Sequence, residues 1–360
     1  MRKIKIAQIG IGHDHAPEIF DSILAQDDIF EVKGFCVCEG EEAQYEAQKG
    51  KVYAKSTRLS LEEILNDPQL DAVTVECQEI ILTKYAQMAI DHGLHVHMDK
   101  PGSADHEAFE TLMRSAKEKN LTLHLGYMYR YNPAVRHTLE LVKSGKLGKI
   151  YSVEAHMDCL HNAKKRQWLN TFPGGMLFFL GCHLIDLIVQ IQGVPEEIIP
   201  LSTCTGFDGV TGQDYGMTVF QYPGGISFAK TCAAEPGGFL RRQLVVCGEN
   251  GTVEIKPFEK YISPSVPRRT MTTGIKEFSK EEAQKKGWHF DADYREIEPV
   301  NRYDNMMAAF AAMVCGEQEN PYTYEHEVML HRILLKSCGV EIDYKTKFVY
   351  KNYYHVITHT

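Results

Sequence analysis

The sequence lacks three features that would mark a membrane protein or a nucleic-acid-binding protein. No apolar run approaches a membrane span, which needs about 18 residues. Positive charge is not in excess, since 39 Lys and Arg stand against 48 Asp and Glu, and no long basic run occurs. We therefore expect neither a membrane nor a nucleic acid as a partner. The N-terminus also lacks the apolar core of a secretory signal peptide, about 7–15 residues long, which favours a cytoplasmic location.

Cysteine is present, but not in a pattern that builds a metal site or a disulfide framework. The 10 cysteines are scattered, none of them forms a Cys-x-x-Cys pair, and most lie inside apolar runs. Such spacing is typical of buried, reduced thiols in a cytoplasmic protein.

The length of 360 residues exceeds what one hydrophobic core usually serves, so two domains are expected. Residues 1–125 alternate between short apolar runs and stretches with helical spacing. This alternation predicts βαβ units and an α/β domain with a Rossmann-type parallel sheet. The expected strands are 4–9, 32–38, 72–75, 95–98 and 122–125.

Residues 126–345 have longer apolar stretches separated by turn sequences such as "YPGG" at 222–225 and "ENG" at 249–251. Strands joined by such turns predict an α+β domain with a large, mostly antiparallel open sheet. Helices expected at 175–191, 303–314 and 324–338 would cover one face of that sheet. The stretch 257–300 is rich in charge and proline and is expected to be irregular, and the tail at 346–360 has no predicted placement.

The stretch "IGIGHDH" at residues 9–15 has the composition of a phosphate-binding loop between a strand and a helix. Gly10 permits a tight turn, and Gly12 lets the backbone approach a phosphate. Backbone N–H groups of Ile11 and His13 would face the same ligand at the positive end of the helix. His15 stands where a third glycine is expected, which alters helix packing more than binding. The loop therefore predicts a dinucleotide site.

A metal site is the alternative interpretation of the same loop, because His13, Asp14 and His15 are all possible ligands. Neighbouring side chains at a helix start diverge, and the positive helix end repels a cation. We therefore expect no metal here.

Two further stretches are expected to line the cofactor. Glu39 follows the second strand and could accept both hydroxyls of a ribose, which favours NAD over NADP because no arginine follows to hold a 2′-phosphate. Cys77 and Gln78 follow the strand at 72–75 and can present backbone groups to the second ribose. The alternative interpretation of Glu39 is that it is a solvated loop residue with no role in cofactor binding.

The stretch "HMDKPGS" at 97–103 resembles the Glu-Lys-Pro signature of the glucose–fructose oxidoreductase, inositol dehydrogenase and rhizopine-catabolism (Gfo/Idh/MocA) family, with Asp99 in place of glutamate. The resemblance continues through "GYMYRYNPAV" (126–135), "SGKLGKIYSVEA" (144–155), "GGMLFFLGCHLIDL" (174–187) and "YDNMMAAFAAMVCGEQENP" (303–321). It implies an NAD(P)-dependent oxidoreductase. It also implies a homodimer or homotetramer formed through the open sheet of the second domain.

The resemblance also implies roles for particular residues. Lys100 would be catalytic or orient the substrate, next to Asp99 in the cofactor crevice. His183 would be an acid–base residue, as in relatives that oxidise sugars. Those relatives carry an aspartate four residues earlier, where this chain has Phe179. Asp186 could orient the His183 ring instead, or could be a structural helix residue.

Residues near the expected junction of the domains could bind the substrate. Tyr129 and Arg130 follow the last strand of the first domain, and Arg130 could bind a carboxylate or a pair of hydroxyls. An ion pair between the domains is an equally good interpretation of Arg130. Trp168 and Thr171 could form a far wall that stacks on a sugar and donates a hydrogen bond.

These features together predict an oxidoreductase that moves a hydride between a secondary alcohol of a sugar, cyclitol or polyol and the nicotinamide of NAD. Two alternatives stay open. One is a lyase or glycosidase that uses tightly bound NAD for transient oxidation, which Phe179 favours because the usual residue set is incomplete. The other is a non-catalytic protein that senses NAD or a metabolite.

Overall fold

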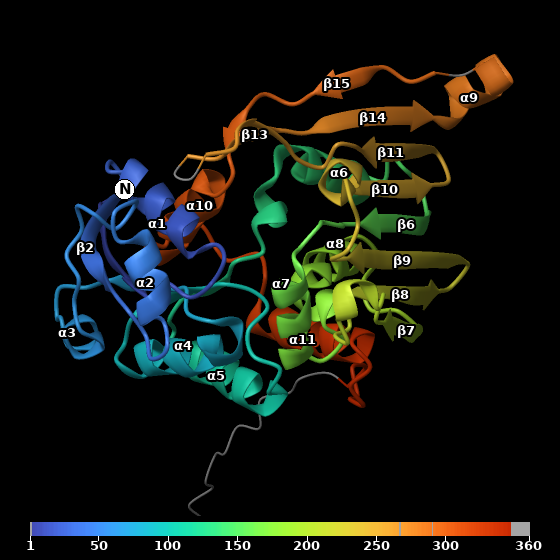
Figure 1. Cartoon of the computed structure of the whole chain (residues 1–360). Coiled ribbons are helices and arrows are strands. Elements are labelled where there is room, and N and C mark those ends of the chain that lie inside the picture. Colours follow the sequence, from blue (N-terminus) through green and yellow to red (C-terminus); the bar gives the residue numbers. More distant parts are fainter. Residues whose placement is uncertain (1, 266–267, 290, 347–360) are drawn as a thin grey trace, which may run out of the picture.

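The computed structural model describes residues 2–265, 268–289 and 291–346. Two sheets stand next to each other, the first formed by the N-terminal residues and the second by the middle of the chain (Figure 1). Helices from the C-terminal part lie between and behind them (Figure 1). The predicted tail at 346–360 lies, apart from Thr346, outside the described residues.

The first sheet confirms the predicted α/β fold. Its five strands are all parallel and follow the order β2-β1-β3-β4-β5. They bury almost every side chain, because helices cover both faces. The strands are β1 (Ile4–Ile9), β2 (Phe30–Cys36), β3 (Ala72–Val75), β4 (His95–Met98) and β5 (Leu123–Leu125).

The connections of this sheet follow local sequence signals. Ser60 and Glu63 form the capping box that opens the short helix α3. The strand order reverses between β1 and β3, and in open α/β sheets ligands bind at the carboxyl ends of the strands at this point. The connecting helices are α1 (Ala16–Ala25), α2 (Glu42–Gln48), α3 (Leu61–Leu65), α4 (Leu82–Asp91) and α5 (His106–Glu118).

The second sheet has eight strands in the order β15-β14-β11-β10-β6-β9-β8-β7. Every neighbouring pair is antiparallel except β6 and β9, so the predicted mostly antiparallel sheet is confirmed. The strands are β6 (Ile150–His156), β7 (Glu197–Thr203), β8 (Tyr215–Tyr222), β9 (Gly225–Cys232), β10 (Gln243–Gly248), β11 (Gly251–Ile255), β14 (Gly274–Ser279) and β15 (Tyr294–Glu296).

The helices around the second sheet differ from the prediction in one respect. Helix α10 (Asp304–Val314) was expected on the second sheet, but it packs against α1. Its Phe310 ring stacks on His124 of β5, with ring centroids 5.6 Å apart, so it covers the first sheet. Helix α11 (Tyr324–Ser337) lies between α5 and α8 (Cys182–Gln192) and contacts both. The other helices are α6 (Pro133–Lys143) and α7 (Ala163–Trp168).

The expectation that residues 257–300 are irregular is wrong. This stretch forms a small three-stranded sheet from β12 (Lys260–Ser263), β13 (Thr270–Thr272) and β16 (Val300–Asn301). It also forms β14, the short helix α9 (Lys280–Lys286) and β15, which together make an arm at the edge of the second sheet (Figure 1). β12, β15 and β16 are edge strands, which tolerate charged side chains, and such side chains hid them from the hydrophobic pattern.

All ten cysteines are unpaired, and most of them are buried, in agreement with the expectation of reduced thiols. Within the described residues, we find no helix with the length and apolar character that a membrane crossing requires.

Candidate active site

The loop after β1 packs directly against the loop after β3. Gly10 has a φ of +84°, and a Cβ atom there would lie 2.6 Å from the backbone of Cys77. A larger residue would push the two loops apart, so glycine is required. Cys77 itself is fully buried, and the next residue, Gln78, donates its backbone N–H to the Glu41 carboxylate at 3.2 Å.

The buried acidic residue at this loop is Glu41, which the sequence analysis did not single out, and contact of Glu39 with a ribose stays a prediction. Glu39 is exposed, whereas the buried carboxylate of Glu41 accepts hydrogen bonds from the backbone N–H groups of Ile11 at 2.8 Å, Cys38 at 3.0 Å and Gln78 at 3.2 Å. Burial raises the pKa of Glu41, and these hydrogen bonds oppose the shift. Gly40, with a φ of +83°, lets the chain turn so that Glu41 points inward. That glycine was the signal for Glu41 in the sequence.

The same backbone N–H groups form a donor set that suits the phosphates and ribose hydroxyls of a dinucleotide. They converge from the ends of β1, β2 and β3, and Gly12 adds no side chain to obstruct them. The residues therefore fit NAD(P). Glu41 occupies these donors in the structure, so a ligand that uses them must share them with its carboxylate or displace it.

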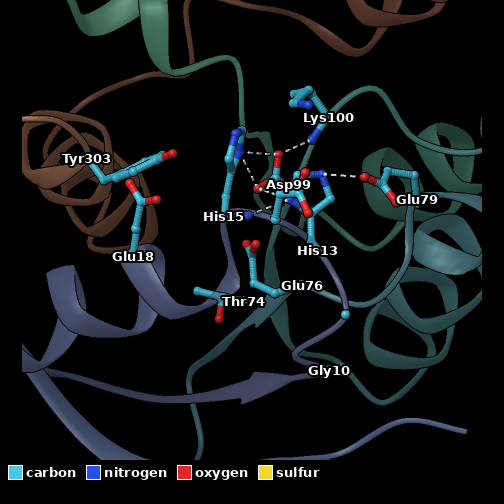
Figure 2. A network of polar contacts seen from close by, with 12 residues as sticks. Gly10, His13, His15, Glu18, Thr74, Glu76, Glu79, Asp99, Lys100 and Tyr303 are labelled. Atoms are coloured by element: carbon cyan, nitrogen blue, oxygen red, sulfur yellow. Dashed lines mark hydrogen bonds and ion pairs between the residues drawn. The ribbon is translucent and has the colours of Figure 1, made fainter. Parts of the chain in front are cut away.

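Beyond the glycine loop, His13 and His15 converge on Asp99, the residue after β4 (Figure 2). The Asp99 Oδ2 atom lies 3.1 Å from His13 Nδ1 and 3.0 Å from His15 Nδ1. Asp14 points elsewhere and pairs with Lys165 of α7 at 2.9 Å. Asp14 thus points away from His13 and His15, as expected for neighbouring side chains. The two histidines, however, point toward the same carboxylate.

Burial and charge shift the pKa values in this cluster in opposite directions. Burial lowers the pKa of His15 to about 3, although Asp99 opposes it. For His13, burial also acts downward, but Asp99 and Glu79 outweigh it and raise its pKa. The pKa of Asp99 is held well below its usual range by the two histidines, against the effect of burial. Burial and the neighbouring Asp99 raise the pKa of Glu76 well above the usual value.

Lys100 lies beside this cluster and is 1% exposed. Its Nζ donates to the backbone carbonyl of Phe179 at 3.2 Å and lies 5.0 Å from the centre of the Phe179 ring. Phe179 belongs to a π-helical turn, Leu177–Gly181, that precedes α8. Such turns are frequent at functional sites. Where relatives were expected to place a carboxylate, this chain therefore offers Lys100 a carbonyl oxygen and an aromatic face.

His183, on the first turn of α8, is also 1% exposed. Its ring contacts the edges of Tyr129 and Tyr127, with centroids 4.9 and 5.9 Å apart, and lies 6.4 Å from the His15 ring. In the part of the chain that the structure describes, neither ring nitrogen of His183 has a hydrogen-bond partner. Burial, followed by the charge of Lys100, holds the pKa of His183 well below its usual value. The neutral imidazole is thus available to a ligand.

Arg130 forms the buried ion pair that was one of its two interpretations. Its guanidinium donates to Asp186 of α8 at 2.8–3.1 Å and to Glu327 of α11 at 2.5 and 3.0 Å. All of its nitrogens are used, so the predicted substrate contact is not supported. The expectation that Asp186 orients His183 is corrected as well, because the Asp186 carboxylate binds Arg130 and Gln190 instead.

The remaining predicted substrate residues lie in different surroundings. The Tyr129 hydroxyl donates to Glu259 at 2.7 Å, so only its ring faces His183. Trp168 is half-buried, whereas Thr171 is exposed and its hydroxyl donates to the Trp168 carbonyl at 2.9 Å. Trp168 lines a cavity of about 270 Å³ between the glycine loop and α7. Its other lining residues include Gly12, Asp14, Gln78, Glu79 and Lys165.

The parallel sheet, the glycine loop and the donors at its switch point define a two-domain chain whose first domain is a Rossmann unit. Two family models match it: residues 4–127 match the oxidoreductase family with an NAD-binding Rossmann fold, and residues 135–254 match the GFO/IDH/MocA C-terminal domain. The chain belongs to the Gfo/Idh/MocA family of oxidoreductases.

Similar proteins include two named enzymes. The scyllo-inositol 2-dehydrogenase (NADP(+)) IolW of Bacillus subtilis is 26% identical over 201 residues, 55% of this chain and 55% of that protein. The D-xylose 1-dehydrogenase (NADP(+)) 2 of Haloferax volcanii is 26% identical over 191 residues, 52% of this chain and 58% of that protein. The chain thus spans about half the length of the curated relatives that it matches.

Solved structures agree on the fold. An oxidoreductase from Thermotoga maritima superposes with a TM-score of 0.71 at 17% identity, over 94% of this chain and 97% of that one. Identity at this level shows the fold alone.

Proposed function

We propose that this chain is an NAD(P)-dependent oxidoreductase acting on a secondary alcohol of a sugar, cyclitol or related polyol. The observation that carries the proposal is the burial of Lys100 and His183 at the domain junction, where His183 keeps two ring nitrogens without a partner among the described residues. Buried, unpaired polar groups are costly unless a ligand uses them. The names of the inositol and xylose dehydrogenases among the relatives support the substrate class.

Each group at the site would have its own role in the reaction. The glycine loop with Gly10 and Gly12, beside the carboxylate of Glu41, would hold the dinucleotide, which when bound supplies the hydride acceptor or donor. The Lys100 ammonium would hold the substrate oxygen and exchange its proton. On oxidation the proton of the reacting hydroxyl would pass, directly or through Lys100, to His183, which is neutral at pH 7 and would return it on reduction.

We also propose a preference for NAD over NADP. The carboxylate of Glu41 accepts from Cys38 at the end of β2, where a cofactor's adenosine ribose is expected. A 2′-phosphate there would be repelled by this charge. Equilibrium binding of NAD⁺ and NADP⁺ by calorimetry checks the preference, and tighter binding of NADP⁺ would refute it.

Turnover measured on a panel of sugars, cyclitols and polyols tests the activity. Lys100→Met is expected to lower kcat/KM for the best substrate by about 10²–10⁴-fold, because it removes the proton-exchanging group. Lys146→Met, at an exposed lysine, is the matched control and is expected to change nothing. An unchanged kcat/KM in Lys100→Met refutes the assignment. Turnover without accumulation of NADH would favour the lyase or glycosidase, and nucleotide binding without any turnover would favour the sensor.

For the assembly, we propose a homodimer or homotetramer formed through the open face of the second sheet. Ile199, Val219 and Phe228 are neighbours in register across β7, β8 and β9, and their side chains remain partly exposed on this face. Ile226 of β9 adds to the same face at 58% exposure. A contiguous apolar patch of this kind is typical of an interaction surface. Sedimentation of Val219→Asp against the unchanged chain tests it, and a monomeric unchanged chain would refute it.

A further inference from the structure

The cluster of His13, His15 and Asp99 has the spacing of ligands around one ion. One ligand atom from each residue lies within 4.8 Å of the others, and the closest pairs are separated by 3.0 and 3.1 Å. Two atoms that each bind one ion at about 2.1 Å are about 3.0–3.4 Å apart in octahedral or tetrahedral geometry. The side chains thus need little movement to share a cation.

Hydrogen bonding alone leaves this cluster with too many acceptors. His13 Nδ1 lies 3.1 Å from the backbone nitrogen of His15 and 3.1 Å from Asp99 Oδ2, and its single lone pair in the neutral ring accepts the His15 N–H, so a metal bound at Nδ1 would replace that hydrogen bond. Asp99 Oδ1 already accepts the backbone N–H of Lys100 at 2.7 Å.

Several buried carboxylates lie around the cluster of His13, His15 and Asp99. Asp99, Glu76 and Glu79 are all at most 2% exposed, and Lys100 is the lysine beside them. Carboxylates buried this close together are compensated in proteins by bound protons, by a neighbouring imidazolium such as that of His13, or by a cation.

Glu76 is an independent sign of a ligand. It lies at the end of β3, is fully buried, and both of its carboxylate oxygens have no hydrogen-bond partner within the described chain. Figure 2 shows its carboxylate pointing toward the space between His13, His15 and Asp99. The nearest histidine nitrogen outside this group is His97 Nε2, 3.7 Å from Oε1.

We propose that His13, His15 and Asp99 form a site for a divalent transition metal such as Zn²⁺, and that Glu76, which lies outside this three-residue group in the structure, moves in as a fourth ligand when the ion binds. Two imidazoles and carboxylates are the donor set of such ions, rather than of Mg²⁺ or Ca²⁺, which prefer oxygen alone. The site lies at the carboxyl ends of β1, β3 and β4, next to Lys100. A metal with an open position there would bind a water or a substrate oxygen.

The experiment uses the full chain, stripped with a chelator and free of nucleotide and substrate. Titration with Zn²⁺ by calorimetry, with bound zinc counted by plasma mass spectrometry, is expected to show one zinc per chain. His15→Ala and Asp99→Asn are each expected to weaken binding by about 100-fold or more, and Glu76→Gln by about 10–100-fold. His92→Ala, at an exposed histidine, is the matched control and is expected to bind zinc normally.

Two results would overturn the proposal. One is a folded, stripped chain that binds no stoichiometric zinc. The other is zinc binding that persists unchanged in both His15→Ala and Asp99→Asn. Because Asp99→Asn could fail to fold, Co²⁺ titration of the unchanged chain gives a second readout, and visible bands typical of nitrogen and oxygen ligands are expected. Since no cofactor is present, failure of the oxidoreductase proposal would leave these results unaffected.

Discussion

Replacing Arg130 by methionine is expected to destabilise the protein by about 3–5 kcal/mol, because it removes one partner of a buried ion-pair network. Asp186 and Glu327 are each 2% exposed at the side chain, and the Arg130 side chain is fully buried. Without the guanidinium, two carboxylates would remain in the interior with little to compensate them. Burial already raises the pKa of Asp186, so the loss of Arg130 would favour its protonated form still more.

Urea unfolding followed by circular dichroism measures the effect, since the shift in midpoint multiplied by the slope gives the change in free energy of unfolding. Arg136→Met, at an exposed arginine of α6, is the control and is expected to stay within about 0.5 kcal/mol of the unchanged chain. Replacing Arg130 by methionine together with Asp186 and Glu327 by leucine is expected to recover most of the loss, because no buried charge is left unpaired.

A different outcome would restore the substrate-binding role of Arg130. If Arg130→Met unfolds at the same urea concentration as the unchanged chain but raises KM, the guanidinium serves the substrate and the structural argument is wrong. The two roles thus separate cleanly in one pair of measurements.

Three further predictions concern other buried groups. Glu41→Ala is expected to lower the free energy of unfolding by about 1–3 kcal/mol in urea melts, because three backbone N–H groups lose their acceptor. His183→Phe is expected to leave stability unchanged or slightly raised, since no hydrogen bond to a described residue is lost, while kcat/KM falls. Although burial opposes it, Arg302 and Arg242 hold the pKa of Glu259 below its usual range, so its stabilisation is present above about pH 4.3 and is lost as pH falls through the lower folded pKa. Urea melts from pH 7 downward should therefore show the stability gap between Glu259→Gln and the unchanged chain closing below about pH 4.3, and a constant gap would contradict this.

Much of the fold was predictable because its signals are local. The strands at 4–9, 72–75 and 95–98 are buried on both faces, so their short apolar runs stand out, and their bounds agree with β1, β3 and β4. Helix α10 was recognised, but its apolar face does not encode which sheet it covers, and it packs on the first one. Charged side chains on exposed strands concealed β14 and β15.

The residues of the candidate site were likewise predicted only in part. Lys100 and His183 were found from motifs in the sequence, and their roles remain predictions. Glu41 was missed because the direction of a side chain after Gly40 depends on a backbone turn. The partners of Arg130 lie 56 and 197 residues away, and no local pattern reveals such a pairing.

The position of α10 also affects the order in which the protein can be completed during synthesis. The sheet of the first domain is finished by residue 125, but the surface around His97 and His124 is covered by Phe310, with ring centroids 5.8 and 5.6 Å apart. While the residues between β5 and α10 are being synthesised, Phe310 is not yet present to cover the surface around His97 and His124. The surface is covered only after Phe310 has been synthesised, 185 residues after the end of β5 at Leu125.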